Sequence, residues 1–293
     1  MHISLFDSPT VVTNGIANAE RARAAGLHRY WMPQVMNADT MVTMGAVAAA
    51  VPDILLGTSV MAMQTMLPQT MAQQARTVNQ ISNGRFTLGI GVNHEPVVTN
   101  RWGLPWDKPY SRFVEYLDAL MPLLNGEPVD VSGTFIKHTT AIDVPGDAPG
   151  LMLAALGPKM LKLAAERSEG TILWMTGPKT VAEHIKPGIE AGGGGQMVAG
   201  VSVIVTSSDE ETEQARSWAN KALAIYPQLP SYRAVMDREG ATEAADLVLI
   251  GDVDAVRTGI QRYEDAGTNE VAINLMGSSE QNDQCWELMA SLV

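Results

Sequence analysis

The sequence predicts an α/β protein folded as a (β/α)₈ barrel, and two observations support this fold class. Short apolar runs that suit buried strands alternate along the chain with longer segments in which apolar residues recur at helical spacing. About eight such alternations occur within 293 residues, a length that is normal for a barrel of this kind. An open, doubly wound sheet fits this pattern less well, so a closed TIM barrel with insertions is the expected architecture.

The first part of the chain predicts four strands, at residues 3–6 and 30–32, within 54–63, and at 86–92. The strand at 86–92 is apolar on both faces, as a barrel strand between the interior and the helix layer should be. Helices are expected at 15–25 and 38–51, and then around four residues that share one face: Met71, Ala75, Val78 and Ile81. Asn83–Gly84 predicts a left-handed cap at the end of that third helix.

The rest of the chain continues the alternation. A helix should carry Phe113, Leu117, Leu120 and Leu124, and later strands are expected at 151–156, 171–175, 198–205 and 271–275. Helices are expected at 158–167, at 180–191, from the acidic start DEETEQ, and at the C-terminal end of the chain. Three segments, near 95–110, 127–150 and 226–249, have no place in the repeat. We interpret them as insertions in a single TIM-barrel domain that spans residues 1–293.

Composition limits the classes of function. The net charge of −12 would repel nucleic acid and anionic membranes, so neither is expected as a partner, whereas a small anionic ligand could still bind a local group of amides. Cys285 is the sole cysteine, which excludes an intrachain disulfide. The start MHISLFDSPTVV does not resemble a signal peptide, and no apolar run approaches the length of a membrane helix. We expect a soluble cytoplasmic protein.

Chemistry in such a barrel is expected at the C-terminal ends of strands. Four strand ends stand out: GTSVMAM (57–63), GVNHEP (91–96), AALGPKM (154–160) and LWMTGPKT (173–180). The last two share a Gly-Pro-Lys tripeptide, in which the first free helix amides and the lysine suit a phosphate. The alternative is that Gly-Pro only starts a helix, as it often does.

His94 has two interpretations, a hydrogen-bonded structural residue or a functional residue beside Glu95 at the catalytic rim. A metal site is not expected, because the other four histidines lie at no ligand spacing: His2, His28, His138 and His184. Met61 and Met63 are equally compatible with core packing and with an apolar wall for a flat ring or a substrate.

Three stretches together resemble the bacterial luciferase-like family: LLGTSVMAM, QISNGRFTLGIGVNHEP and LAALGPKMLKLAAERSEGTILWMTGP. More narrowly, they resemble the branch that uses the deazaflavin coenzyme F420, and the resemblance covers nearly the whole chain in order. It implies the same barrel with insertions, and it implies F420 as the cofactor, with FMN as the alternative.

The resemblance also implies where the coenzyme would bind. In the family, the peptide after the third strand is often cis and forms a bulge against the ring, and the matching bond is Ser59–Val60. Carried over position by position, the residues facing the ring would be Ser59, Val60, Met61, Val92 and Asn93, with His94 beside them. The residues holding the phosphate would be Gly157, Pro158, Lys159, Thr176 and Gly177.

The chain also departs from the sugar-phosphate dehydrogenases of this branch. They carry an Asp-His pair after the second strand and a glutamate after the fourth, whereas this sequence has Gln34, Val35 and His94 there. The resemblance therefore implies hydride transfer between deazaflavin C5 and a small, weakly polar organic substrate. We expect His94 to act as general acid or hydrogen-bond donor, and Gln34 to orient His94 or the substrate.

Three other functions remain alternatives: an FMN-dependent monooxygenase of the same superfamily, a non-catalytic coenzyme-binding protein, and, least favoured, a metal-dependent hydrolase. Family members commonly pair through helices near the second to fourth strands, so a homodimer is expected. The segment MGAVAAAV (44–51) would allow close helix approach, although it could equally pack on its own barrel.

Overall fold

The computed structural model describes residues 1–293 and confirms the predicted fold class, a (β/α)₈ barrel. Its eight parallel strands, in chain order, are β1 (His2–Phe6), β2 (Arg29–Met32), β3 (Leu55–Thr58), β5 (Phe86–Gly91), β8 (Gly150–Ala154), β9 (Gly170–Trp174), β10 (Gln196–Val205) and β12 (Glu270–Leu275). Helix α1 (Val12–Ala24) follows β1. By their internal contacts the residues form two compact units: unit 1 contains 1–7, 20–31 and 155–293, and unit 2 contains 8–19 and 32–154.

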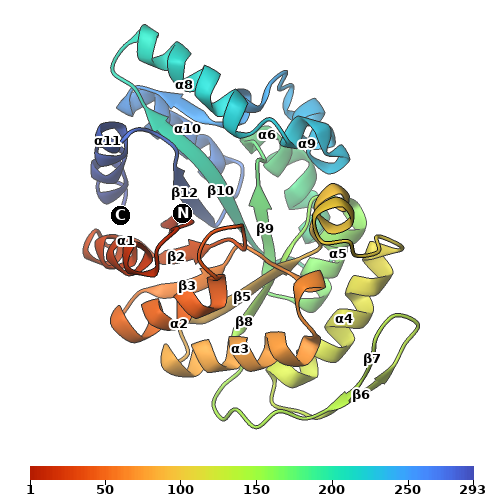
Figure 1. Cartoon of the computed structure of the whole chain (residues 1–293). Helices are drawn as coiled ribbons and strands as arrows, with labels where there is room; N and C mark the ends of the chain where they lie inside the picture. Colours follow the sequence, from red (N-terminus) through yellow and green to blue (C-terminus); the bar gives the residue numbers. More distant parts are fainter. The chain divides into compact units, whose positions relative to one another are not determined.

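Unit 2 contains the strands β3, β5 and β8 in parallel, and the short strand β4 (Met61–Ala62) also pairs with β5. All six residues of β5 are buried, in agreement with its apolar sequence. Its helices are α2 (Thr40–Ala50), α3 (Pro68–Ile81) and α4 (Pro109–Leu124), and α3 and α4 lie side by side (Figure 1). Asn83 and Gly84 have φ angles of 54° and 80°, so the predicted left-handed cap of α3 is confirmed.

The insertion at 127–150 contains a separate antiparallel hairpin, β6 (Val129–Ser132) and β7 (Lys137–Thr140), drawn in yellow-green in Figure 1. Glu115 of α4 holds its turn, because the carboxylate accepts hydrogen bonds from the amides of Phe135 at 2.6 Å and Ile136 at 2.9 Å. These backbone donors lower the pKa of Glu115. The carboxylate therefore ties the insertion to α4.

Unit 1 contains the parallel strands β9, β10, β12, β1 and β2, and β11 (Leu249–Gly251) pairs with the end of β10. Its helices are α5 (Pro158–Arg167), α6 (Pro178–Thr180), α7 (Lys186–Glu190), α8 (Asp209–Ala222), α9 (Pro230–Glu239), α10 (Val253–Asp265) and α11 (Ser279–Ala290). The buried Glu270 accepts hydrogen bonds from Ser4 Oγ at 2.6 Å and Trp31 Nε1 at 2.5 Å, which joins the start of β12 to β1 and β2.

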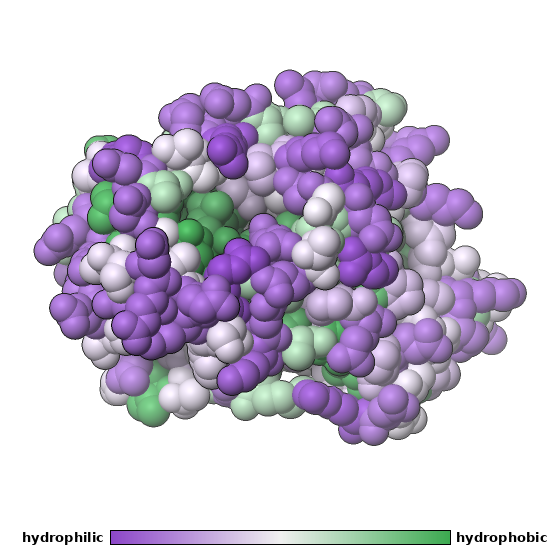
Figure 2. Space-filling view, turned by 90° about the horizontal axis from the view of Figure 1, so that it is seen from above, coloured by the Kyte–Doolittle hydropathy of each residue, from purple (hydrophilic) through white to green (hydrophobic).

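Three features of the structure bear on the charge, hydropathy and cysteine content of the sequence. Hydrophilic residues cover most of the face shown in Figure 2. No helix combines the length and the apolar character that crossing a membrane would require. Cys285 of α11 is buried, and burial raises the pKa of its thiol to about 12.

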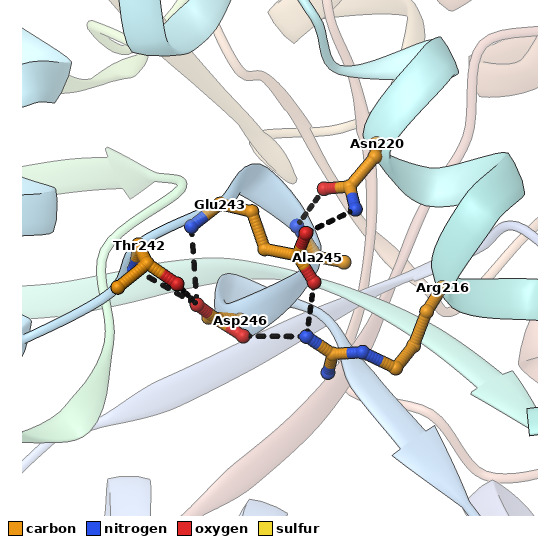
Figure 3. Close-up of polar contacts among 6 residues, drawn as sticks. All are labelled: Arg216, Asn220, Thr242, Glu243, Ala245 and Asp246. Atoms are coloured by element: carbon orange, nitrogen blue, oxygen red, sulfur yellow. Dashed lines mark hydrogen bonds and ion pairs between the residues drawn. The ribbon is translucent and has the colours of Figure 1, made fainter. Parts of the chain in front are cut away.

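The insertion at 226–249 forms α9 and the short 3₁₀ turn η5 (Ala244–Leu247), which belong to an apolar cluster with α8. A polar network fixes η5 to α8 (Figure 3). Arg216 pairs with Glu243, and with Asp246 at 2.7 Å, while Asn220 donates to Glu243 at 2.7 Å. Partial burial alone would raise the pKa of Asp246, but the hydrogen bonds from Arg216 and from nearby backbone and hydroxyl donors lower it to about 2.

The segment 54–63 contains the third strand, as predicted, and a second short strand as well. It divides into β3 and β4, and the Ser59–Val60 peptide bond between them is cis, as the resemblance implied. The insertion at 95–110 contains a single turn of π-helix, η2 (Val97–Arg101), and then leads into α4. The four glycines at 192–195 lie directly before β10, and the last three have positive φ angles.

Candidate functional site

In unit 2, the segment that follows β3 is held from both sides by backbone hydrogen bonds. The amide of Ser59 donates to Met32 O at 2.9 Å, and Val60 O accepts a bond from the amide of Gln34 at 3.4 Å. Met61 then enters β4, where it lies opposite Ile90 of β5. The predicted ring-facing residues Ser59, Val60 and Met61 thus occupy a bulge fixed between the ends of β2 and β5.

Gln34 holds this bulge through its side chain. Its Oε1 accepts a hydrogen bond from the amide of Ala62 at 2.8 Å, and its Nε2 donates to Thr65 Oγ1 at 3.2 Å. Both ends of the side-chain amide are therefore engaged with the segment after β4. These contacts hold the backbone that follows Val60 and Met61.

Gly91, at the end of β5, provides space for the same bulge. A Cβ atom at this position would lie 3.1 Å from Val60 Cγ2 and 2.9 Å from the Cβ of Ala154. Such distances are too short for comfortable packing, so a side chain here would force Val60 to move. The glycine lets Val60 lie directly against β5.

Val92, Asn93 and His94 follow β5, and all three are partly buried. Asn93 Oδ1 accepts a hydrogen bond from the amide of His94 at 2.7 Å, and the carbonyl of His94 accepts from the amides that begin η2. Burial lowers the pKa of His94 below its ordinary value, because desolvation disfavours the charged ring. At neutral pH the imidazole is therefore uncharged, with one nitrogen able to donate a hydrogen bond and the other able to accept one.

In unit 1, the first Gly-Pro-Lys turn starts α5 and is open. Gly157 is the N-cap, Pro158 is the first helical residue, and no side chain caps this helix. Nothing lies within 4 Å of the position that a Cβ of Gly157 would take. The exposed Lys159 stands beside these free amides, so the turn has the donors and the space that a phosphate needs.

The second Gly-Pro-Lys turn starts α6 and already holds an anion from the chain itself. Glu239, the last residue of α9, accepts hydrogen bonds from the amides of Lys179 at 3.2 Å and Thr180 at 2.7 Å. A Cβ at Gly177 would lie 2.2 Å from Glu239 Cδ, so only glycine leaves room for this carboxylate. Thr176 is buried beside it, and its carbonyl accepts a hydrogen bond from the hydroxyl of Tyr263 at 3.1 Å.

The two turns share a tripeptide, but only the first has amides that are open to a bound anion. Glu239, which makes this difference, was not predicted from the sequence. Glu239 lies 59 and 60 residues from its two amide partners, and no local motif connects it to them. One indirect signal was available, since a carboxylate at the C-terminal end of a helix opposes the helix dipole and calls for a partner elsewhere. No group of three or more His, Cys, Asp or Glu side chains is arranged to hold a metal ion.

Together the fold and these loops define a (β/α)₈-barrel protein whose candidate residues lie at the C-terminal ends of its strands. The chain belongs to the luciferase-like monooxygenase family, whose profile matches residues 4–270.

Similar proteins agree with this assignment. A 5,10-methylenetetrahydromethanopterin reductase from Archaeoglobus fulgidus is 30% identical over 231 residues, covering 76% of this chain and 69% of the relative. An F420-dependent glucose-6-phosphate dehydrogenase from Beutenbergia cavernae is 34% identical over 139 residues, covering 44% of this chain and 40% of the relative. Among solved structures, an F420-dependent secondary alcohol dehydrogenase in complex with an F420-acetone adduct superposes with a TM-score of 0.80 at 18% identity, over 100% of this chain and 98% of that one.

Proposed function

We propose that this chain is a coenzyme F420-dependent oxidoreductase that transfers hydride between the deazaflavin and a small, weakly polar organic substrate. The observation that carries the proposal is that proteins named for F420 resemble this chain both in sequence and in fold. The bulge at Val60 and the open turn at Gly157 supply, in the chain itself, surfaces suited to a flat ring and to a phosphate.

Each unit supplies one group of candidate coenzyme residues, and each group is assigned by itself. Ser59, Val60, Met61, Val92 and Asn93 would contact the ring. Gly157, Pro158 and Lys159 would hold the phosphate, because their turn has uncapped amides, whereas Glu239 occupies the amides that follow Gly177. Thr176 and Gly177 are then assigned to the wall of the site. The first group suits a planar ring, and the second suits a phosphate.

When bound, the deazaflavin supplies a two-electron hydride donor or acceptor at C5. The chain supplies the orientation of the ring and a route for one proton. Gln34 fixes the Val60 bulge, so the ring contact has one defined position. His94 exchanges the proton with the substrate oxygen or nitrogen through its imidazole. Met61 is fully buried and supports the bulge by its pairing with β5.

The protonation of His94 favours one direction at neutral pH. Since burial lowers its pKa, the ring is neutral and can accept a proton from an alcohol as hydride leaves the carbon. In the opposite direction a protonated His94 is required, so reduction is favoured at lower pH. An alcohol suits this protonation state, and we assign a secondary alcohol first because a structure that superposes on this chain is named a secondary alcohol dehydrogenase.

Cofactor titration tests the proposal and separates it from the alternative suggested by the family name, an FMN-dependent monooxygenase. Purified chain is titrated with F420 and, separately, with FMN, while quenching of cofactor fluorescence is followed. Tight binding of F420, weakened in Lys159→Ala, is expected, and Lys179→Ala is the matched control from the other turn. Tight binding of FMN with no binding of F420 would contradict the proposal and favour the FMN-dependent monooxygenase.

Turnover of the F420-loaded chain tests the role of His94 and separates an enzyme from a coenzyme-binding protein. Oxidation of small secondary alcohols should slow by about 10²–10⁴-fold in His94→Ala, with coenzyme affinity little changed. His94→Gln keeps a hydrogen-bond donor and loses proton exchange, so it should bind the coenzyme as the parent does without recovering the rate. Equal turnover in parent and His94→Ala would remove His94 from the reaction.

The proposal includes a homodimer. Helix α2 has no charged residue, and Val42, Ala49 and Ala50 on it are exposed, with Val42 66% accessible. An uncharged helix face of small residues suits close packing against a second copy. Light scattering should give a dimer for the parent and a monomer for Val42→Glu, and a monomeric parent would contradict this part.

The proposal also includes a single domain and a cytoplasmic location. The family match, which spans residues of both units, supports the single domain. The one cysteine, which forms no disulfide, agrees with the cytoplasm.

A further inference from the structure

Unit 1 contains a cleft that none of the proposed coenzyme or catalytic residues line. It lies between α8 and the start of α11 (both labelled in Figure 1), with residues after β10 and β12 at its base, and its volume is about 540 Å³. That volume is in the range of small-molecule sites, which is roughly 300–1,000 Å³. The cleft can therefore accept a small organic molecule.

Trp218 of α8 forms one wall of the cleft. Its side chain is 55% exposed, although its indole Nε1 donates a hydrogen bond to the carbonyl of Met276 at 3.2 Å. The hydrogen bond fixes the edge of the ring and leaves much of its surface accessible. A tryptophan face held in this way is the best aromatic partner for a cation.

All charged side chains that line the cleft are negative. Twelve residues line the cleft, including Glu211 and Glu280, and none of them is Lys, Arg or His. The amide of Ser207 donates to Glu211 at 2.8 Å, which fixes that carboxylate at the edge of the cleft. The nearest arginine on α8, Arg216, is engaged by Glu243 and Asp246. Neither carboxylate in the cleft is therefore neutralised by a basic side chain, and the net charge of −12 adds to the negative field.

The remaining lining supports an amphiphilic ligand. Ile204, Ala215 and Met276 give an apolar base, while Gln214, Gln281 and Gln284 place side-chain amides at the rim. The two carboxylates disfavour an anion, and a ligand that carries a positive charge gains from them what an apolar molecule cannot.

We propose that this cleft binds a small organic cation, with its quaternary or protonated ammonium group over the indole of Trp218 and its charge balanced by Glu211 and Glu280. The site is separate from the residues assigned to the coenzyme and does not depend on that assignment. Binding there adds a ligand of a chemical class that the hydride-transfer reaction does not use.

Calorimetric titration of the full chain with choline at low salt tests this proposal, with 3,3-dimethylbutan-1-ol as the uncharged probe of the same shape. Saturable choline binding is expected, weakened about fivefold or more in Trp218→Leu and in Glu280→Gln, since a cation–π or exposed ionic contact contributes about 1 kcal/mol. Glu213→Gln removes one charge from the same helix outside the cleft, and it should leave binding unchanged.

The outcomes that overturn the proposal are equally defined. Absence of saturable choline binding up to about 100 mM removes the site. If the uncharged probe binds as tightly as choline, the positive charge of the ligand does not contribute to binding. If Glu213→Gln weakens binding as much as Glu280→Gln does, choline responds only to the overall negative charge of the chain and not to this cleft. Glu280 is exposed in the first turn of α11, so its variant keeps the test valid even if Trp218→Leu fails to fold.

Discussion

Replacing Gly177 with alanine probes the carboxylate that occupies the second Gly-Pro-Lys turn. The new methyl group would lie 2.2 Å from Glu239 Cδ and 2.4 Å from its Oε1, so the carboxylate must leave the amides. Gly157 is the matched control, because it begins the same tripeptide and nothing lies within 4 Å of its Cβ position. Both glycines have negative φ, −80° and −92°, so the backbone itself tolerates alanine at either site.

The expected cost follows from the two hydrogen bonds that would be lost, at 3.2 Å to Lys179 and 2.7 Å to Thr180. A hydrogen bond to a charged group contributes about 1.5–3 kcal/mol, and the exposed Lys179 amide regains water, so about 2–3 kcal/mol is lost in all. Alanine also reduces the conformational entropy of the unfolded chain, which raises the free energy of unfolding by about 0.4–1 kcal/mol at either glycine. Gly177→Ala should therefore destabilise by about 1–3 kcal/mol, and Gly157→Ala should stabilise by up to about 1 kcal/mol.

Thermal unfolding followed by circular dichroism measures the difference. In a chain of this size 1 kcal/mol shifts Tm by about 2 °C, so the two variants should differ by about 4–6 °C. Repeating Gly177→Ala in a Glu239→Ala background should show no further loss from the carboxylate, since its bonds are already absent. Equal Tm values for the two glycine variants, or an undiminished loss in that background, would refute the reasoning.

Three other outcomes follow from the site and the network of Figure 3. Gly91→Ala would place a methyl group 3.1 Å from Val60 Cγ2, and it should weaken coenzyme binding in a fluorescence titration; a dissociation constant within about twofold of the parent value would contradict the role of this packing. The lowered pKa of His94 implies that kcat/KM for alcohol oxidation rises with pH only below 6.5 and is level above it, and a profile still rising above about pH 7 would contradict a neutral base. The pKa of Asp246 falls from 3.8 to about 2 on folding, so its stabilising pairing with Arg216 is complete above the higher value and is lost as the pH falls toward the lower. Asp246→Asn should flatten acid unfolding in that window, and an unchanged pH dependence would argue against it.

Much of the fold followed from the sequence because the apolar pattern and the helix signals agree. Gly-Pro marked the start of α5 at Pro158, and Asn83–Gly84 marked the end of α3. The division of 54–63 into two strands could not be predicted, because LLGTSVMAM is continuously apolar or small and the break is a matter of backbone geometry. The sequence of the insertion at 226–249 does not predict α9, because this short helix has few apolar residues and depends on the cluster around Met236.

The candidate site was predictable only as far as local motifs extend. The strand pattern of the sequence was sufficient to place Val60 after β3 and His94 after β5. It was not sufficient to show that Gln34 would be held by Ala62 and Thr65, because that contact depends on how the segments after β2 and β4 meet. The two identical Gly-Pro-Lys turns give the clearest limit, since a residue about sixty positions away decides which of them is open.

The single buried cysteine gives this chain an experimental advantage. Cys285 is inaccessible and its thiol remains protonated at neutral pH, because its pKa is raised to about 12. A cysteine introduced at an exposed position, such as Thr134 in the turn of the β6–β7 hairpin, would be the one thiol to react with a maleimide dye. The native chain therefore accepts a fluorescent or spin label at a chosen position without prior removal of any cysteine.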